Sequence, residues 1–239
     1  MCTPDLFHVL RSRSTSRAAF DPRRPVTSAE LNALLEALRW APTAYNMQNY
    51  EVVAVDDEVL LDEIGALRAE VPAEFLRESY AQLSFSEDEL RARRRGLLAD
   101  AFPPAWLDPA SWEGRSPEAV AGRPLAELLA GAPLLLVVLY DVTTRAPASA
   151  GDTLGLISLG CVLQSVWLAA EALGLSFQVV SAFAMTSVAP ALKELLGVPE
   201  HLEIAYGARV GHPAAPEPAP ARVRREVAEL VHHNGYARR

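Results

Sequence analysis

A short stretch near the start of the chain combines residue types that could bind a small anion. Arg13-Ser14-Thr15-Ser16-Arg17 places two guanidinium groups and three hydroxyls within five positions. Arginine forms paired hydrogen bonds with phosphate oxygens, and hydroxyls add further donors, so the stretch suits a phosphate or another small anion. A solvated, arginine-rich surface loop is the alternative interpretation.

A second basic stretch, Arg222-Val223-Arg224-Arg225, lies near the other end of the chain. Alternate side chains of an extended segment point the same way, so Arg222 and Arg224 could reach one ligand together. A charged terminal tail is the alternative. Two basic clusters at opposite ends of a chain with a formal net charge of −8 are more informative together than either is alone.

The third stretch, residues 41–50, lies between an expected helix and an expected strand. It supplies Pro42, Thr43, Asn46 and Gln48, which combine a stiff backbone with a hydroxyl and two side-chain amides. Such groups could contact the polar edge of a heterocycle. An ordinary helix-to-strand turn is the alternative.

Several other chemistries have no motif in this sequence. Because histidines and cysteines do not cluster with metal-ligand spacing, we expect no metal site. The sequence lacks GxSxG, GxGxxG and GxxxxGK[ST], which argues against a serine hydrolase, a Rossmann dehydrogenase and a P-loop enzyme. Thirty acidic against 22 basic residues argue against nucleic-acid or membrane partners. Two cysteines and an N-terminus without a secretory apolar core favour the cytoplasm.

The expected elements alternate irregularly between helix and strand. Thr27 and Glu30 have the spacing of a capping box, and the helix that they begin should end before Pro42. Further helices are expected at 5–10, 58–70, 86–99, 152–173 and 188–196, and strands at 50–55, 134–140, 176–181 and 202–210. This mixture indicates the α+β class.

The helix expected at 152–173 is apolar on nearly every side. Such a helix lies either in the centre of a core or against a second subunit. Polar residues within it, among them Gln164 and Glu171, make a membrane span unfavourable.

Residues 72–124 differ in composition from their surroundings, with prolines at 103, 104, 109 and 117 and large aromatic side chains at 102, 106 and 112. We interpret them as an insertion or lid within a single domain of residues 1–239. The aromatic residues Phe102, Trp106 and Trp112 are candidates for a substrate wall, with packing on the domain surface as the alternative. Residues 213–239 should form an extended C-terminal arm.

Taken together, these stretches resemble the FMN-dependent nitroreductase family. Residues 13–17 resemble its opening R-R-S-x-R pattern, and residues 41–50 resemble A-P-S-x-x-N-x-Q-P-W. Residues 168–175 are similar to the L-A-A-x-x-L-G-L pattern that ends its dimerisation helix. Residues 179–183 take the place of its flavin-edge loop, and residues 222–232 resemble its basic C-terminal segment.

Two departures from the family pattern lie next to the implied flavin site. Asn49 and Tyr50 replace the usual Pro-Trp pair, which alters the wall beside the flavin. Ala182 stands where many relatives have glycine, which bears on how closely the backbone can approach the flavin.

The resemblance implies a three-layer α/β/α sandwich with a mostly antiparallel central sheet, assembled as an interlocked homodimer with FMN at the interface. It implies that the FMN phosphate is held by Arg13, Thr15, Arg222 and Arg224, with Arg17 toward the phosphate or the pyrimidine edge. The implied cofactor-binding residues are Arg13, Ser14, Thr15, Arg17, Pro42, Thr43, Asn46, Gln48, Val179, Ser181, Ala182, Arg222 and Arg224.

The loop residues Pro42, Thr43 and Asn46 would approach the isoalloxazine from the partner subunit, and the backbone of Ser181 and Ala182 would face flavin N5 and O4. Tyr50 joins the three insertion aromatics as a candidate for the substrate wall.

The function that the resemblance implies is an FMN-dependent enzyme that transfers hydride from NADH or NADPH through flavin N5 to a nitroaromatic, quinone or similar acceptor. No side chain is then required as a general acid or base, because the flavin carries the chemistry. The alternatives are another reaction on the same scaffold, namely dehalogenation, flavin cleavage or azoline oxidation, and a non-catalytic protein that binds or stores FMN.

Overall fold

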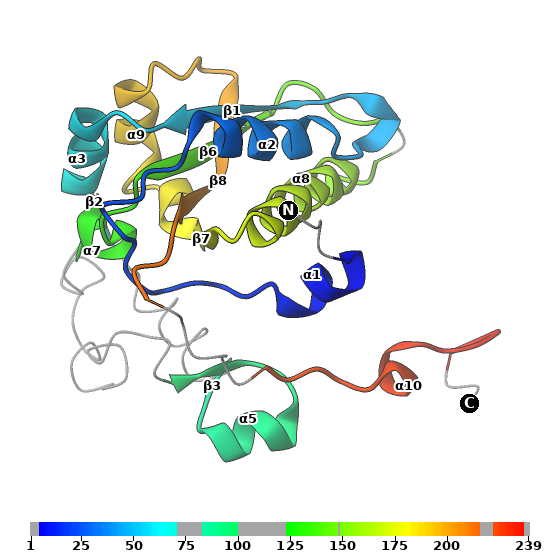
Figure 1. Cartoon of the computed structure of the whole chain (residues 1–239). Helices are drawn as coiled ribbons and strands as arrows, with labels where there is room; N and C mark the ends of the chain where they lie inside the picture. Colours follow the sequence, from blue (N-terminus) through cyan, green and yellow to red (C-terminus); the bar gives the residue numbers. More distant parts are fainter. Residues whose placement is uncertain (1–4, 71–82, 100–122, 148, 216–221, 237–239) are drawn as a thin grey trace, which may run out of the picture. The chain divides into compact units, whose positions relative to one another are not determined.

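The computed structural model describes residues 5–70, 83–99, 123–147, 149–215 and 222–236 (Figure 1). The chain divides into two compact units. The first unit comprises Met1–Ala69 and Arg123–Glu217, and the second comprises Glu70–Gly122 and Pro218–Arg239. The candidate aromatics Phe102, Trp106 and Trp112 lie outside the described residues.

A four-stranded sheet with the order β1-β6-β8-β7 forms the centre of the first unit, and every neighbouring pair in it is antiparallel. Its strands are β1 (Tyr50–Val55), β6 (Leu134–Asp141), β7 (Ser176–Val180) and β8 (Leu202–Gly211). The continuous apolar run of β6 is explained by its central position, since Leu134 to Leu139 are all buried. A buried inner strand needs apolar side chains on both faces.

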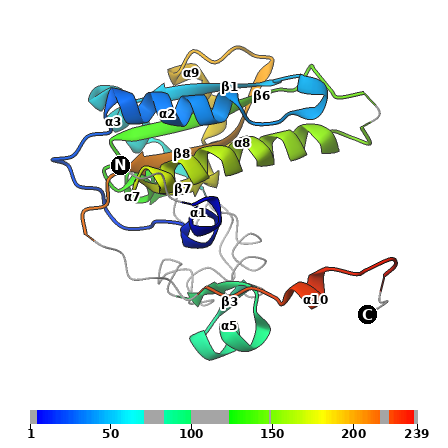
Figure 2. The ribbon, with the colours of Figure 1, turned by 45° about the vertical axis from the view of Figure 1, so that its right-hand side comes forward.

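Helices cover both faces of this sheet (Figure 2). On one face, Leu134 and Leu136 of β6 pack in a cluster with residues of α2 (Ser28–Arg39) and α8 (Thr153–Ala172). On the other face, Leu135 and Val137 of β6 pack with residues of three further helices. Those helices are α3 (Glu58–Ala66), α7 (Leu125–Leu129) and α9 (Ala189–Leu195). The predicted three-layer α+β fold with an antiparallel centre is confirmed.

Local sequence signals set several boundaries as expected. The Thr27 hydroxyl accepts from the Glu30 backbone N–H at 3.2 Å, and the Glu30 carboxylate accepts from the Thr27 N–H at 2.8 Å, which is the predicted capping box. Gly174, at φ 70°, follows the end of α8, in the left-handed region that glycine adopts without strain. Pro190 lies in the first turn of α9.

The helix expected at 58–70 is shorter than predicted. It ends at Ala66, because Arg68–Ala69 (β2) pairs instead with Arg123–Pro124 (β5) in a two-stranded antiparallel sheet. This pairing joins segments far apart in the sequence, so no local pattern could indicate it. The short helix at the start of the chain, α1 (Leu6–Ser12), extends two residues beyond its predicted end.

Helix α8 is the one described helix that is long and apolar enough to cross a membrane, judged by length and composition alone. In this fold it packs on the sheet with one face, while only 28% of its most apolar window is buried. Leu156 is 65% exposed and Ile157 is 56% exposed. A strongly apolar helix therefore presents large side chains on its outer face.

The second unit contains α5 (Glu87–Arg93), α10 (Val227–Leu230), and the parallel pair β3 (Ser84–Phe85) and β4 (Leu97–Leu98). The charged helix predicted at 86–99 begins as expected, with a capping box between Ser86 and Glu89. It ends early because Arg94 adopts a left-handed conformation with φ 52° and Gly96 has φ 93°. The chain then turns to form β4.

Candidate functional site

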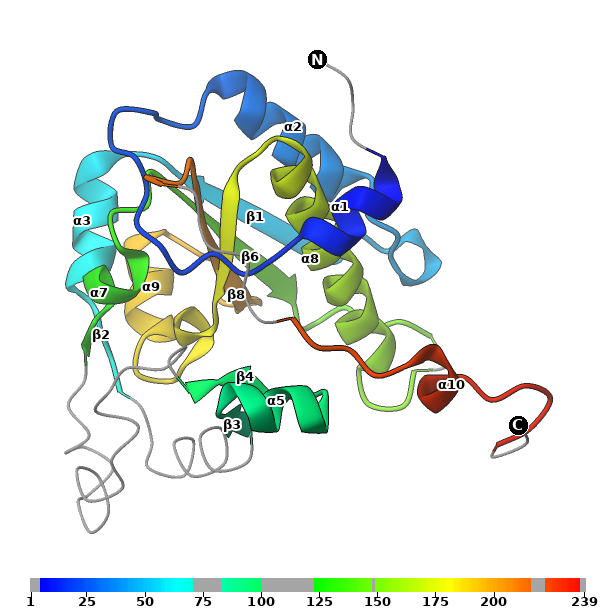
Figure 3. The same cartoon turned by 60° about the horizontal axis from the view of Figure 1, so that its bottom comes forward.

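The Arg13–Arg17 segment runs past the outer edge of the central sheet, beside β7 (Figure 3). The Ser16 backbone N–H donates to the Phe177 carbonyl at 3.1 Å, which attaches the segment to this edge strand. Arg13, Ser14 and Thr15 are half-buried, whereas Arg17 is exposed. The predicted anion-binding stretch is therefore fixed against the fold rather than loose in solvent.

Trp167 of α8 fixes the first half of this segment. Its indole Nε1–H donates to the Ser14 carbonyl at 3.2 Å, and the Arg13 guanidinium lies 4.1 Å from the centre of its ring. The same ring stacks on Phe177 of β7 with centroids 5.3 Å apart. A guanidinium over an indole face is a stabilising cation–π arrangement, so Trp167 holds Arg13 at a defined place.

Arg209 of β8 fixes the second half of the segment from beneath. Its side chain is 1% exposed, and its NH2 group donates to the carbonyls of Ser16 and Ala18 at 3.2 and 3.1 Å. NH1 donates to the Leu129 carbonyl at 3.1 Å, and Nε donates to the Gln178 side chain at 2.7 Å. One buried guanidinium thus joins the Arg13–Arg17 segment, α7 and β7.

The far end of β7 leads into η5 (Ser181–Ala184), where Ser181 is exposed and Ala182 is buried. Phe183, fully buried, packs against Gly207 of β8, where an added Cβ would lie 1.9 Å from its ring. This packing holds the turn on the sheet. Ala182 belongs to the hydrophobic core, whereas Ser181 beside it is exposed. Val179 is half-buried in β7.

The loop between α2 and β1 has an unusual backbone. Tyr45, Asn46 and Gln48 all have positive φ, at 52°, 55° and 48°, although none is glycine. Such conformations cost on the order of 1–3 kcal/mol each and gather at ligand-binding sites. Side-chain bonds hold the loop: Thr43 Oγ1 accepts from the Gln48 N–H at 3.1 Å, and Asn46 Oδ1 accepts from Gln48 Nε2 at 3.1 Å.

This loop, η1 (Ala44–Asn46) included, is also attached to α8. The Ala44 N–H donates to the buried Ser158 hydroxyl at 2.9 Å, and that hydroxyl donates to the Leu154 carbonyl at 2.8 Å. Pro42, near the start of this loop, is exposed.

The structure groups some predicted site residues and separates others. The Arg13–Arg17 segment and Ser181 lie at opposite ends of β7, about 13 Å apart along the strand. The loop contacts α8 at Ser158, whereas the arginine segment contacts it at Trp167, about 14 Å further along the helix axis. The Arg13–Arg17 segment and Ser181 thus lie at the two ends of β7. The loop between α2 and β1 is attached to a different part of α8 from the arginine segment.

Tyr50, a predicted wall residue, belongs to the fold between α2 and the sheet. Its hydroxyl donates to the Leu38 carbonyl at 2.6 Å, and burial raises the pKa of that hydroxyl above its ordinary value. Arg222 and Arg224 are exposed residues of the second unit, and their predicted meeting with Arg13 stays a prediction.

Sequence reasoning missed three residues that position this site: Trp167, Gln178 and Arg209. Trp167 lies in the helix expected at 152–173, which the sequence marks only as apolar. A signal did exist for Arg209, because it is the one basic residue of the strand Leu202–Gly211 and is flanked by apolar residues, whereas the strand's other charged residue, Glu203, lies near its start. A charge in the buried part of a strand must find partners inside the fold.

Among the described residues, the structure contains no group of three or more His, Cys, Asp or Glu side chains that could hold a metal ion. The polar groups that the site offers are guanidiniums, hydroxyls, amides and backbone N–H groups. These are the groups that bind phosphates and the polar edges of heterocycles.

Comparison with known proteins adds a family to this geometry. The sequence model of the nitroreductase family matches residues 10–212. Among curated proteins, none matches this sequence.

Solved structures with this fold include a nitroreductase with bound FMN from Desulfitobacterium hafniense, with a TM-score of 0.58 and 21% identity, over 97% of this chain and 99% of that one. Nitroreductase A from Vibrio parahaemolyticus has a TM-score of 0.61 and 19% identity, over 99% of this chain and 78% of the other. A nitroreductase with bound FMN from Bacteroides fragilis has a TM-score of 0.54 and 20% identity, over 89% and 90%. At these identities the likeness concerns the fold.

Proposed function

Because the chain belongs to the nitroreductase family, we propose that it is an FMN-dependent oxidoreductase that takes hydride from NADH or NADPH and delivers it to a nitroaromatic, a quinone or a similar small acceptor. The observation that carries the proposal is the match of the family model over residues 10–212, together with the anchored arginine and hydroxyl segment that this stretch contains. The FMN bound in two of the related structures supports the choice of cofactor.

The first unit fits a mononucleotide along β7. At one end, Arg13 is held by Trp167, while Thr15 and Arg17 form no hydrogen bond or ion pair with any described residue. These two side chains can therefore donate to a phosphate, with Arg222 and Arg224 as the proposed partners from the C-terminal arm. At the other end, the exposed side of Ser181 can present backbone groups to a flavin ring.

FMN, when bound, supplies the atom that accepts and donates hydride, and the chain supplies anchorage and orientation. Guanidiniums at one end of β7 neutralise the phosphate. The strained Tyr45–Gln48 loop is already fixed by Thr43 and Ser158, so its amides need no reordering to meet a ring edge. No side chain is assigned a proton-transfer step.

We also propose that two copies of the chain form the active protein. The outer face of α8 carries Leu156 and Ile157, both more than half exposed, on a helix that is apolar on nearly every side. Exposed apolar faces of this kind mark interaction sites. In a dimer, the Pro42–Gln48 loop of one chain would reach the β7 edge of the other. The loop would then contribute to the same site as Arg13 of the partner chain, although the two are separated within a single chain.

The test begins with the absorption spectrum of the purified protein, which should show bound flavin or take up added FMN. Anaerobic titration with NADH and with NADPH should bleach the flavin band, and a nitroaromatic or quinone should restore it. A preparation that neither contains nor takes up FMN contradicts the proposal. Flavin that neither nicotinamide reduces would favour FMN storage instead, and turnover only with halogenated, flavin or azoline substrates would favour another reaction on this scaffold.

Residue assignments need a separate test. Replacing Arg222 and Arg224 together by alanine should raise the FMN dissociation constant by about a hundredfold, since each charged hydrogen bond is worth roughly 1.5–3 kcal/mol. The matched control replaces Arg23 and Arg24, two exposed arginines of the first unit, and should leave FMN affinity unchanged. Equal affinities in both double variants would refute the assignment of the C-terminal arginines.

A further inference from the structure

The second unit contains a cavity of about 550 Å³ with a strongly basic lining. Four arginines contribute to it: Arg93, Arg94, Arg95 and Arg225. Glu229, His232 and Tyr236 complete the lining. This volume lies within the range of about 300–1,000 Å³ that is typical of small-ligand pockets.

Two segments distant in the sequence build the cavity. Arg93 ends α5, and the left-handed Arg94 and the turn at Gly96 then redirect the chain, so that three consecutive arginines line one cavity. Arg225 precedes α10, which begins with a capping box between Glu226 and Glu229. The left-handed Arg94 and the turn at Gly96 thus allow the guanidiniums of neighbouring arginines to line the same cavity.

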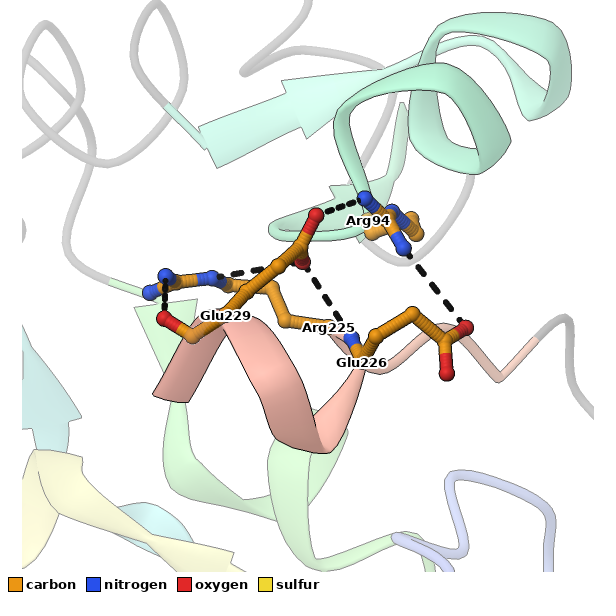
Figure 4. Close-up of polar contacts among 4 residues, drawn as sticks. All are labelled: Arg94, Arg225, Glu226 and Glu229. Atoms are coloured by element: carbon orange, nitrogen blue, oxygen red, sulfur yellow. Dashed lines mark hydrogen bonds and ion pairs between the residues drawn. The ribbon is translucent and has the colours of Figure 1, made fainter. Parts of the chain in front are cut away.

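Carboxylates neutralise only part of this charge (Figure 4). Arg94 forms an ion pair with Glu229 and lies 3.6 Å from a Glu226 oxygen. Arg225 Nε lies 3.8 Å from the Glu229 carboxylate, and its NH2 donates to the Glu229 carbonyl at 2.6 Å. One carboxylate therefore serves two guanidiniums of the lining.

The remaining two arginines form no ion pair with a carboxylate among the described residues. Arg93 lies over the Phe85 ring at 4.6 Å, and Arg95 is exposed without a hydrogen bond or ion pair to any described side chain. Beside them, the rings of His232 and Tyr236 lie 4.4 Å apart at 49°. The cavity thus offers unsatisfied guanidinium donors next to an aromatic surface.

We propose that this cavity binds a nucleotide, with its phosphates on the guanidiniums and its base against His232 or Tyr236. Guanidinium groups bind phosphate oxygens in a planar, paired geometry, and several together favour an anion with more than one charge. Exposed aromatic rings stack on the flat faces of bases. Glu229 acts as an internal counter-anion for Arg94 and Arg225. A bound phosphate replaces the Glu229 carboxylate at these two guanidiniums.

This site differs in its residues from the proposed FMN site. The lining includes Arg225 but neither Arg222 nor Arg224, and it includes no residue of the Arg13–Arg17 segment. The inference therefore goes beyond the proposed function, and it is tested on protein already saturated with FMN.

Isothermal titration calorimetry of the full chain, saturated with FMN, tests the proposal with three probes: ADP, pyrophosphate and adenosine. ADP should bind at least about tenfold more tightly than adenosine, because the guanidinium–phosphate bonds are the stronger contacts. Raising the salt concentration from about 50 to about 200 mM should weaken ADP binding. Pyrophosphate that binds as tightly as ADP would overturn the nucleotide assignment, and the absence of ADP binding would overturn the site.

Variants locate the binding. Arg95→Gln should weaken ADP binding by about tenfold, the size of one charged hydrogen bond. Its matched control is Arg91→Gln, because Arg91 lies four residues before Arg95, in α5, but pairs with Glu87 and does not line the cavity. Tyr236→Ala should weaken ADP binding and leave pyrophosphate binding unchanged. Equal effects of the two arginine variants would overturn the proposal.

Glu229→Gln tests the counter-anion role and should tighten ADP binding several-fold, since the competing charge is removed. Weaker ADP binding in this variant, measured on folded protein, contradicts that role. FMN occupancy is measured in parallel from the absorption spectrum. Arg95→Gln should leave it unchanged, and loss of FMN from this variant would assign the cavity to the flavin site and overturn the inference.

Discussion

Arg209 and Gln178 face each other across the paired strands β8 and β7, and the Arg209 Nε–H donates to the Gln178 side-chain oxygen at 2.7 Å. The same guanidinium holds the backbone carbonyls of Ser16 and Ala18. One side chain therefore connects the edge strand that ends at Ser181 with the segment that carries Arg13 and Arg17. These are the two parts of the first unit that the proposed cofactor requires.

Replacing Arg209 by methionine should lower the free energy of unfolding by roughly 3 kcal/mol or more. Three carbonyls that it now satisfies, on Ser16, Ala18 and Leu129, would lose a buried donor, at about 1–3 kcal/mol each. Denaturant unfolding measures the loss. FMN affinity, measured where the variant is folded, should also fall, and Arg209→Lys should recover part of it.

Gln178→Ala is the control for this prediction. It removes one side-chain bond and should cost only about 1 kcal/mol. An Arg209→Met variant that is no less stable than Gln178→Ala would show that the carbonyl contacts contribute nothing.

A glutamate at position 156 should disrupt the proposed dimer. Leu156 is 65% exposed on α8, and a charge there would be buried against the apolar face of a second copy. Light scattering should report a monomer for Leu156→Glu, with FMN lost alongside. The matched control is Val59→Glu on α3, where Val59 is 66% exposed, and it should leave the mass unchanged. A dimeric Leu156→Glu variant would remove α8 from the interface.

Asp141 should make stability depend on pH in the acid range. Hydrogen bonds from the side chains of Thr143 and Thr144 and from the Thr143 backbone lower the pKa of its carboxyl from 3.8 to about 2. Because the folded pKa is the lower one, the ionised carboxylate stabilises the fold above about pH 4, and this contribution is lost as the pH falls toward 2.

Comparison with Asp141→Asn isolates this contribution. Its melting temperature should lie below that of the wild-type protein at pH 6, and the difference should shrink between pH 4 and pH 2. A difference that stays constant across this range would mean that the charge of Asp141 plays no part.

Removal of the Tyr206 hydroxyl and removal of the Tyr50 hydroxyl should change the stability of the protein in opposite directions. The Tyr206 hydroxyl is buried and has no hydrogen-bond partner among the described residues, and burial, with a smaller effect of Tyr50, raises its pKa. Tyr206→Phe should therefore stabilise the protein by up to about 1 kcal/mol.

Tyr50 provides the internal comparison, since its hydroxyl donates to the Leu38 carbonyl. Tyr50→Phe should cost about 1 kcal/mol, because that carbonyl loses its donor. Thermal unfolding of the two variants side by side gives the signs, and a Tyr206→Phe variant that is the less stable of the two contradicts the assignment of an unsatisfied hydroxyl.

The sequence by itself determined the four strands of the central sheet, most of the longer helices and the family resemblance. The capping box at Thr27, the doubly buried strand at 134–140 and the stop at Gly174 are local signals, since each depends on residues adjacent in the chain. The motif segments at 13–17, 41–50 and 168–175 were likewise readable from residue type and spacing.

Only the tertiary structure decided what holds the site in place. Trp167, Gln178 and Arg209 contact the Arg13–Arg17 segment or its neighbours across separations of more than 150 positions, or across strand pairings that no local pattern specifies. The same holds for the early end of α3, which the β2–β5 pairing imposes. Hydrogen bonds and packing between distant segments depend on the completed fold, and local propensity carries no information about them.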